Sequence, residues 1–430
     1  MSKELSGKKI LLGVTGGIAA YKAAELARRL KKAGADVRVI LTAHGAKFVT
    51  PLTFQALTQN PVSTDLFESE LVGPPFGRDL RGQEQQIGHI DLADWADALV
   101  IAPATANVIA RLAAGLADDL LATVALATQG RLVIAPAMNV HMWRHPAVRR
   151  NLATLREAGA LVIDPGEGEM ACGHVGEGRL AELEDLLDGV SRGLTPQDLA
   201  GVGVLVTAGP TAEPIDPVRV LSNRSSGKMG FAIASAAWRH GADVTLVHGP
   251  VSGSLHAPRG LARVAVETAR EMRRAVLDAA PKAAVVIMAA AVADYRPRHA
   301  APRKIKKGKE SLAIDLARTD DILSELGRAK GSRLLVGFAA ETDRVVENAR
   351  EKLDRKNLDV VVANDVTAKG AGFGSDTNRI TILDREGGEE SLPLLPKDEA
   401  AEALIGRVVR RLAPPLPGRG PAASRGRRGA

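Results

Sequence analysis

The same order of elements occurs twice in this chain, about 200 residues apart. Residues 8–17, KKILLGVTGG, run as an apolar strand into glycines, a helical pattern follows, and VRVILT at 37–42 is the next strand. VGVLVTAGPT at 202–211 opens a second series, and GADV stands between helix and strand in both, at 34–37 and 241–244. Strand, helix and strand in this order form a parallel sheet. The repeat therefore predicts an α/β protein with two Rossmann-like doubly wound domains.

The boundaries of these domains follow from where the patterns begin and end. We expect one domain at residues 1–190 and a second at 201–412, joined by a linker at 191–200. The remaining residues, 413–430, are rich in Pro, Gly and Arg and are predicted to be disordered. Because 45% of the 430 residues are hydrophobic, the chain can bury two cores.

The net charge of +7 does not indicate a nucleic-acid partner, because much of it lies in the predicted tail. Four arginines and no acidic residue occur there: Arg419, Arg425, Arg427 and Arg428. Aromatic residues make up 3% of the chain, too few for stacking platforms. There is no apolar run long enough for a membrane helix, no signal-peptide pattern, and a single cysteine that allows no internal disulfide. We expect a cytoplasmic protein without a specific nucleic acid or a membrane as partner.

Ligands of doubly wound sheets bind beyond the carboxyl ends of the strands, so the first strand end is informative. Gly13, Gly16 and Gly17 form a strand-to-helix turn whose N–H groups could hold a phosphate. Their spacing is not G-x-G-x-x-G, and Thr42 rather than an acidic residue ends the second strand. The pattern therefore argues against a dinucleotide and is consistent with a mononucleotide. A tight turn without a ligand is the alternative.

Three further residues of the first half are candidates for chemistry, although each alone could be structural. His89 lies near a helix start, and Asn139 follows a strand in PAMN. Cys172 lies in MACGHVGEGRL, where Gly173, Gly176 and Gly178 exclude a regular helix. A lone cysteine is usually a small buried hydrophobic residue. The residue types alone leave its role open.

Taken together, the motifs of the first half resemble the homo-oligomeric flavin-containing cysteine decarboxylases. The resemblance covers residues 7–185 and rests on GVTGGIAAYK, GHI, APATANVIARLAAGLADDLL, APAMN and ACGHVGEGR. It implies a flavodoxin-like flavoprotein domain that binds FMN through the residues Gly16, Gly17, Thr42, Thr105 and Asn107. It also implies that Asn139 binds the substrate carboxylate, that His89 is a general acid/base or positioning group, and that Cys172 donates a proton, with its glycines forming a flap. Residues 69–86 are longer and more polar than the family pattern and are expected to form a surface loop.

The second half has polar strand ends of a different kind. SSGKMG at 225–230 is no P-loop, but it precedes an apolar helix and could bind an anion at the helix start. Asp294 follows a strand. Residues 296–310 hold seven Lys and Arg, which could form either a solvated face or a flap over a triphosphate. Lys352 and Lys356 are spaced to share one helical face, as solvated lysines also are.

These motifs together resemble phosphopantothenate–cysteine ligases over about residues 201–410. The resemblance rests on TAGPT-x-E-P-x-D-P-V-R, SN-x-SSGKMG, AAVADY, KIKK, GFAAET, K-x-x-x-K-N-L-D and ANDV. It implies that CTP activates 4'-phosphopantothenate as an acyl-cytidylate, which the amine of cysteine attacks, with Mg²⁺ offsetting the triphosphate charge. Asn223 would act in conversion of the acyl-cytidylate and Lys304 would be the flap cation. The nucleotide would contact Met288, Ala289, Ala290, Asp294, Thr319, Asp320, Asp321, Ile322, Phe338, Lys352 and Lys356. Asp320 stands where the family pattern has a proline, which could loosen this loop.

A decarboxylase followed by a ligase resembles the bifunctional family of coenzyme A biosynthesis. The product of the ligase, 4'-phosphopantothenoylcysteine, would be the substrate of the decarboxylase. The family implies a homo-oligomer, a dodecamer of trimeric flavin halves and dimeric ligase halves. Two alternatives remain: a flavin-binding regulatory module, which would need neither Cys172 nor Asn139, and an NAD-dependent oxidoreductase, whose fingerprint is absent from this sequence.

Overall fold

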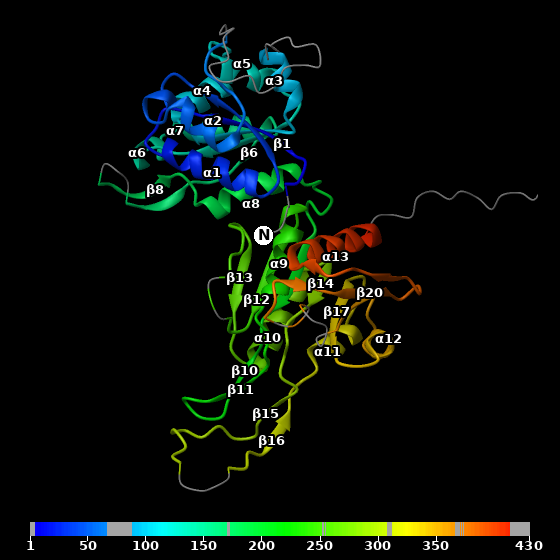
Figure 1. Cartoon of the computed structure of the whole chain (residues 1–430). Helices are drawn as coiled ribbons and strands as arrows, with labels where there is room; N and C mark the ends of the chain where they lie inside the picture. The colour runs from blue at the N-terminus through cyan, green and yellow to red at the C-terminus, as the bar shows by residue number, and fades with distance from the viewer. Residues whose placement is uncertain are drawn as a thin grey trace, which may run out of the picture.

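The computed structural model describes residues 5–66, 88–169, 173–251, 253, 255–307, 312–365, 370, 372 and 374–412. Within these ranges the chain forms two α/β halves, one above the other in Figure 1, and each has its own parallel sheet. The class expected from the sequence is therefore confirmed. Cys172, the expected surface loop at 69–86 and the tail at 413–430 lie outside the described residues.

The first half contains strands and helices in alternation. In chain order they are β1 (Lys9–Val14), α1 (Ala20–Lys32), β2 (Asp36–Leu41), η1 (Gly45–Lys47), α2 (Pro51–Thr58), β3 (Val62–Ser63), α3 (His89–Trp95), β4 (Ala98–Ala104), α4 (Ala106–Ala113), α5 (Leu120–Ala127), β5 (Arg131–Pro136), α6 (Val140–Arg144), α7 (Pro146–Glu157), β6 (Leu161–Val162), β7 (Gly166–Glu169), β8 (Val175–Arg179) and α8 (Leu183–Leu194). Six of the strands form one sheet, and β7 and β8 form a separate hairpin.

The first sheet has the order β3-β2-β1-β4-β5-β6, and neighbouring strands pair in parallel. Without the short edge strand β3, the order is 2-1-3-4-5 in the numbering of the remaining strands, which is that of flavodoxin. Successive strands are added toward one edge of the sheet from β1 to β3 and toward the other edge from β4 to β6, so the order reverses between β1 and β4. This is the switch point at which a ligand is expected to bind.

The second half repeats the scheme with additional antiparallel strands. Its elements are β9 (Gly203–Ala208), β10 (Ala212–Pro214), β11 (Val220–Ser222), α9 (Lys228–Arg239), β12 (Asp243–His248), β13 (Ala262–Ala265), α10 (Ala269–Ala279), η2 (Ala280–Lys282), β14 (Val285–Met288), β15 (Tyr295–Pro297), β16 (Leu316–Arg318), α11 (Ile322–Arg328), β17 (Leu334–Glu341), α12 (Val345–Arg355), β18 (Val360–Asp365), β19 (Thr377–Asn378), β20 (Ile380–Asp384), β21 (Glu389–Ser391), β22 (Leu395–Pro396) and α13 (Lys397–Leu412). The main sheet has the order β13-β12-β9-β14-β17-β18-β20-β21, with its switch point between β9 and β14.

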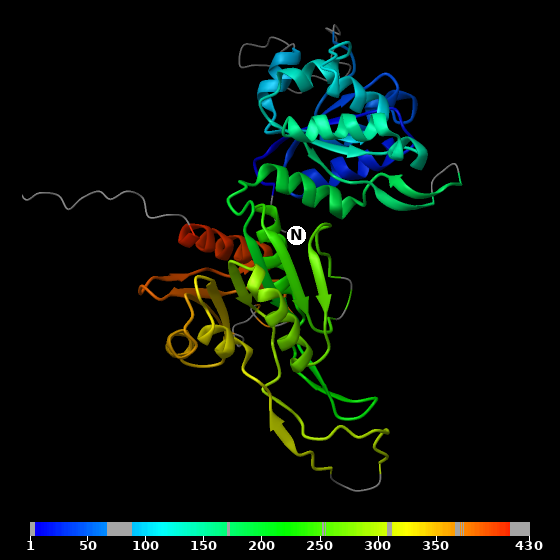
Figure 2. The same ribbon diagram turned by 180° about the vertical axis from the view of Figure 1, so that it is seen from behind.

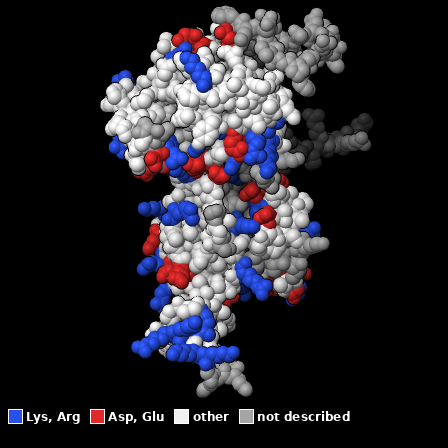
Figure 3. Space-filling view, turned by 60° about the vertical axis from the view of Figure 1, so that its left-hand side comes forward, with Lys and Arg blue, Asp and Glu red and all other residues white. Residues whose placement is uncertain are grey.

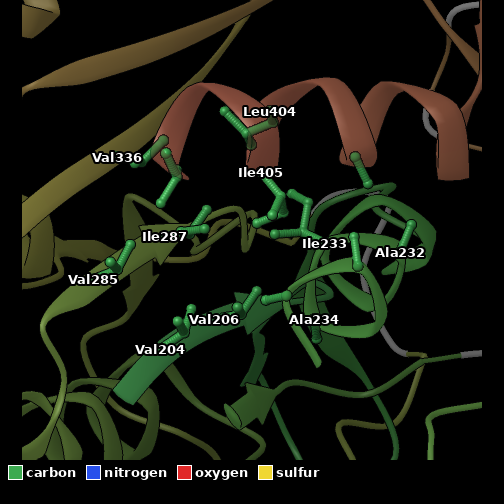
Figure 4. Packing of buried hydrophobic residues seen from close by; sticks show 14 of the residues in the cluster. Val204, Val206, Ala232, Ile233, Ala234, Val285, Ile287, Val336, Leu404 and Ile405 are labelled. Atoms are coloured by element: carbon green, nitrogen blue, oxygen red, sulfur yellow. The ribbon is translucent and has the colours of Figure 1, made fainter. Parts of the chain in front are cut away.

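Helices cover both faces of each sheet, and the apolar side chains between them form the cores. In the second half, α9 and α13 cover one face, where Ile233 and Leu404 pack on Val206 and Ile287 (Figure 4). The other face buries side chains of α10, α11 and α12, among them Met272 and Leu353. Burial of an aliphatic side chain of this size contributes roughly 1.5–3 kcal/mol. These contacts hold the strand ends, and hence the ligand-binding loops, in place.

Two expected boundaries differ from the structure. The stretch from Asn107 to Thr128 reads as one helix, but it is broken between α4 and α5, where Gly115 has a φ of +67° and Asp119 caps α5 through the Ala122 N–H. Helix α8 continues to Leu194, and Val190 belongs to the first core. The connection between the halves therefore begins after Leu194, inside the expected linker at 191–200.

An arm extends beyond the main sheet of the second half. The pairs β10-β11 and β15-β16, with the connection between β15 and β16, form an arm that projects from the second half, at the bottom of Figures 1 and 2. Lys and Arg side chains gather on this arm (Figure 3). Among the described residues, no helix combines the length and the apolar composition that spanning a bilayer requires.

Candidate functional site

A cavity of about 1100 Å³ lies at the switch point of the first sheet, beyond the ends of β1, β2, β4 and β5. Every described residue expected to hold the flavin lines it: Gly16, Gly17, Thr42, Thr105 and Asn107. Asn139 and Met138 of the PAMN motif line it as well. The sequence thus identified residues from separate strand ends that the fold brings together.

The turn after β1 is a cradle into which an additional side chain would not fit. A Cβ at Gly16 would lie 2.3 Å from the Cβ of His44, whereas one at Gly17 would meet only Thr105 Cγ2 at 3.7 Å. Only glycine therefore allows the β1–α1 turn to approach the β2 loop so closely. Helices α1 and α4 both begin at this cavity, where their N–H groups favour a phosphate. The donors present fit a flavin mononucleotide.

Two threonines hold the strand ends around the cavity. Thr15, which we did not expect to have a role, donates from its hydroxyl to Pro103 O at 2.7 Å and accepts from the Thr105 N–H at 3.2 Å, so it joins the ends of β1 and β4. Thr42 donates to Val14 O at 3.2 Å and accepts from the Gly45 N–H. A buried hydroxyl at a strand end is the signal by which Thr15 could have been found.

Asn139 is placed by helix α6 and by the β7-β8 hairpin. Its Oδ1 accepts from the His141 N–H at 2.9 Å and so caps α6, while its Nδ2 lies 2.9 Å from Nδ1 of His174. The glycines of the hairpin allow a close approach: a Cβ at Gly178 would lie 2.3 Å from Met138 O, and the Met138 N–H donates to Gly178 O. Gly176 and Gly178, which we expect to belong to a flap, pack on the Asn139 loop, and Gly178 also lines the cavity.

Two further candidate catalytic residues of the first half were expected, His89 and Cys172. His89 is the first residue of α3 and is not among the residues that line the cavity. Cys172 lies outside the described residues, between Glu169 of β7, which lines the cavity, and Val175 of β8.

A second cleft of about 940 Å³ lies beyond the ends of β14, β17 and β18. Its lining includes every residue expected at the nucleotide except one: Asn223, Met288, Ala289, Ala290, Asp294, Thr319, Asp320, Asp321, Ile322, Phe338, Lys352 and Lys356. Lys304 is the exception. It lies in the segment between β15 and β16 and does not line the cleft.

Hydrogen bonds fix the backbone that lines this cleft. The Ala290 N–H donates to Thr207 Oγ1 at 3.1 Å, and the Ala293 N–H donates to Thr211 Oγ1 at 3.0 Å. Asn223 donates from Nδ2 to Ala291 O at 3.0 Å, which leaves its Oδ1 as the acceptor of this side chain. The loop after β14 is therefore held from the β9 side.

At one end of the cleft, two lysines lie close to acidic and carbonyl oxygens. Lys352 Nζ donates to Phe338 O, and burial, followed by repulsion from Lys356, lowers the pKa of Lys352 to about 8. Lys356 Nζ lies 3.0 Å from Asp321. Burial alone would raise the pKa of Asp321, but the Ser324 N–H and Lys356 outweigh it, so this pKa is lowered. Asp321 caps α11, and the cap is intact although Asp320 replaces the expected proline.

At the other end of the cleft lie two basic residues that were not among those expected at the nucleotide, although Lys228 belongs to the SSGKMG motif expected to bind an anion. Lys228 Nζ lies 2.6 Å from Asp376 Oδ1. Lys397 is 6% exposed, and burial, followed by repulsion from Lys228, lowers its pKa to about 8. Lys397 lies at the start of α13, more than 150 residues away along the chain, so only the fold brings the two together. This end offers cations to an anionic group.

Metal ligands do not gather anywhere in the described part of the chain: it holds no cluster of three or more His, Cys, Asp or Glu. Asp294, Asp320 and Asp321 all line the second cleft, but they do not form such a cluster. A Mg²⁺ ion with several water ligands usually needs one or two carboxylates besides substrate phosphates. The acidic residues of the cleft are consistent with that mode of binding.

Comparison with known proteins supports both halves of this description. Residues 1–195 match the family "Flavoprotein", and residues 199–412 match "DNA/pantothenate metabolism flavoprotein C-terminal domain". The chain is 49% identical over 409 residues to the coenzyme A biosynthesis bifunctional protein CoaBC of Bacillus subtilis (strain 168), covering 94% of this chain and 97% of that protein. It is 46% identical over 412 residues to the protein of the same name from Escherichia coli (strain K12), covering 95% and 98%.

A solved structure with a likeness to the second half is the C-terminal domain of a coenzyme A biosynthesis bifunctional protein CoaBC, at 42% identity and a TM-score of 0.43, covering 50% of this chain and 98% of that one. The two-domain matches and the identity over nearly the whole length lead to one conclusion. The chain belongs to the family of coenzyme A biosynthesis bifunctional proteins, in which a flavoprotein decarboxylase precedes a ligase.

Proposed function

We propose that this enzyme performs two consecutive steps of coenzyme A biosynthesis. The second half joins cysteine to 4'-phosphopantothenate at the expense of CTP, through an acyl-cytidylate. The first half then decarboxylates 4'-phosphopantothenoylcysteine to 4'-phosphopantetheine with FMN as cofactor. The observation that carries this proposal is that motif residues from distant strand ends meet at two cavities, one at the end of each sheet.

In the first half, Gly16, Gly17, Thr105 and Asn107 would hold FMN, with its phosphate at the starts of α1 and α4. FMN supplies an electron sink for loss of CO₂, which a carboxylate on a saturated carbon otherwise lacks. The protein orients the substrate: Asn139 presents its amide nitrogen to the carboxylate. Cys172 would then return a proton from its thiol, a role that requires this thiol to stay protonated.

In the second half, CTP would lie along the cleft over the ends of β14 and β17. Lys352 and Lys356 supply positive charge at one end of the cleft, and Asp294 is placed for the ribose or for Mg²⁺. Asn223 would support conversion of the acyl-cytidylate, with its Nδ2 held by Ala291 O. Lys304 would offset charge on the phosphates from outside the cleft, which requires the arm or a second subunit to bring it there.

A homo-oligomer would complete both sites, and we propose the dodecamer of trimeric flavin halves and dimeric ligase halves. Exposed apolar side chains lie on both halves. Ile18 and Tyr21, each 62% exposed, line the flavin cavity, and Val218, Val220, Tyr295 and Leu316 lie on the arm. His89 is not in the cavity of its own chain, so it could act only at a neighbouring subunit's flavin or after rearrangement. With one cysteine and this metabolic role, the enzyme is expected in the cytoplasm.

The test is to incubate purified protein with 4'-phosphopantothenate, cysteine, CTP and Mg²⁺, and to follow pyrophosphate, CMP and CO₂ separately. We expect all three, and no CO₂ when cysteine is omitted. Addition of 4'-phosphopantothenoylcysteine alone should release CO₂ without CTP. A protein that binds no flavin and forms none of these products would contradict the proposal.

A second experiment examines Cys172. The variant Cys172→Ser should keep its visible flavin spectrum and still release CO₂, but the saturated thiol product should fall strongly, because serine is a much weaker acid than cysteine. Loss of flavin instead would show that Cys172 has a structural role.

A further inference from the structure

His174 contacts the side chain that we expect to bind the substrate carboxylate. Nδ1 of His174 lies 2.9 Å from Nδ2 of Asn139. On its other side, the ring of His174 meets the ring of His141 edge to face, with 5.2 Å between centroids. The sequence prediction assigned no role to His174, because the contact joins residues 35 positions apart on two different elements.

The hydrogen-bonding roles in this contact are determined by chemistry. Asn139 caps α6, so the atom that accepts from the His141 N–H at 2.9 Å must be its oxygen. The atom that faces His174 is then the amide nitrogen, which can only donate. Nδ1 of His174 must therefore accept, and the ring is neutral with its proton on Nε2.

The backbone of His174 is held against the Asn139 loop by three neighbouring contacts. The Met138 N–H donates to Gly178 O at 2.9 Å, Trp143 Nε1 donates to Glu177 at 3.1 Å, and Gly176 lies against Val140, where a Cβ would come within 3.0 Å. These contacts fix the position of strand β8 relative to α6. The distance between His174 and Asn139 is thus set by the packing of both elements.

We propose that neutral His174 is a positioning residue of the decarboxylase half, which holds the Asn139 carboxamide in the orientation that receives a substrate carboxylate. This inference rests on the proposed function. Removal of the Nδ1 acceptor would take this hydrogen bond away from the Asn139 carboxamide, so a substrate carboxylate should bind more weakly.

The test compares two substitutions in the full-length protein. In His174→Asn, the side-chain oxygen can occupy the place of Nδ1 and accept from Asn139. We expect this variant to keep kcat/KM for 4'-phosphopantothenoylcysteine near pH 8 close to that of the wild type. His174→Ala should raise KM about tenfold at pH 8, as expected for loss of one hydrogen bond worth about 1.4 kcal/mol, with a smaller change in kcat.

A matched control is His145→Asn, because Nδ1 of His145 accepts from the Ala147 N–H at 3.2 Å and caps α7 without contacting Asn139. This variant should keep the wild-type kcat and KM. If His174→Ala also retains the wild-type KM, or if His174→Asn raises KM as much as His174→Ala does, His174 does not position Asn139.

A readout independent of turnover separates this inference from the proposed function. Crystal structures should show the Asn139 carboxamide in its wild-type orientation in His174→Asn and turned away from that orientation in His174→Ala. If the carboxamide turns in His174→Ala but the wild type releases no CO₂, the proposed function fails while the positioning role stands. If the wild type decarboxylates but the carboxamide is unchanged in His174→Ala, the proposed function stands and this inference is wrong.

Discussion

In the cleft of the second half, Lys352 lies where burial and a neighbouring ammonium group both disfavour its charge. Its pKa is lowered to about 8, and its Nζ donates to Phe338 O. Its neighbour Lys356 has an acidic partner in Asp321 at 3.0 Å. Two lysines at helical spacing thus have different surroundings, because one faces a carboxylate and the other faces the interior. The spacing in the sequence predicted that they would lie together but not that the pKa of Lys352 would be lowered.

This difference predicts how the affinity for CTP depends on pH. Because the folded protein loses the Lys352 proton near pH 8, well below the value of 10.5 for a free lysine, the KM for CTP should rise between pH 7.5 and 9. Lys352→Met should raise this KM already at pH 7 and should remove the rise. Initial rates of pyrophosphate release at varied CTP measure both. A wild-type KM that is constant up to pH 9.5 would show that the charge of Lys352 does not contribute.

At the scale of elements, the β1–α1 turn determines whether the flavin cavity can form. Substitution Gly16→Ala would place a Cβ 2.3 Å from His44, within a turn that the β2 loop also borders. Gly17→Ala is a matched control, because its Cβ would lie at an ordinary van der Waals distance, 3.7 Å, from Thr105 Cγ2. We expect Gly16→Ala to lower the free energy of unfolding by about 1–3 kcal/mol, as overpacking does, and to lose most of its bound flavin.

The measurements are the ratio of flavin to protein by visible absorbance and the midpoint of urea unfolding. Gly17→Ala should leave the urea midpoint close to that of the wild type. Equal flavin content in Gly16→Ala and wild type would mean that the β2 loop can move away at little cost.

Elements of the fold and most lining residues of both cavities were predictable from the sequence. Strand ends are marked by apolar runs that stop at glycine or polar residues, and parallel sheets bring those ends to one edge. The break between α4 and α5 was not predicted, since both segments are apolar and only Gly115 and Asp119 mark the boundary. The contacts of His174 with Asn139 and of Lys228 with Asp376 depend on packing between distant segments, which no local pattern shows.

At the scale of the molecule, a segment of the ligase half joins the two halves. His256 Nε2 lies 2.6 Å from Asp188 on α8, and Arg259 contacts Asp185 at 3.0 Å and Pro165 O at 3.2 Å. The same segment reaches the cleft of the second half, where Leu255 packs against Gly227, which lines it. The orientation of the halves therefore depends on charged side chains of this segment and of α8.

The contact between His256 and Asp188 makes the junction dependent on pH. The hydrogen bond with Asp188 raises the pKa of His256 above its ordinary value of 6.5. A group whose pKa is raised by folding stabilises the folded state fully below its unfolded pKa, and this stabilisation is lost as the pH rises through the folded pKa. The pair should hold the halves together at pH 6 and contribute little at pH 8.5. Because His256 is 42% exposed, the contribution is at most about 1 kcal/mol.

Release of flavin on heating measures this effect, since it reports unfolding of the first half alone. His256→Ala should lower the release temperature relative to wild type at pH 6, and the difference should shrink at pH 8.5. Asp164→Asn is a suitable control, because it removes an ion pair with Arg156 at 2.7 Å within the first half and leaves the junction intact. Its effect should be similar at both pH values. A difference between His256→Ala and wild type that is equal at pH 6 and pH 8.5 would show that the charge of His256 does not hold the halves together, and that the junction relies instead on the Arg259 contacts and on the stacking of Arg192 over Trp238.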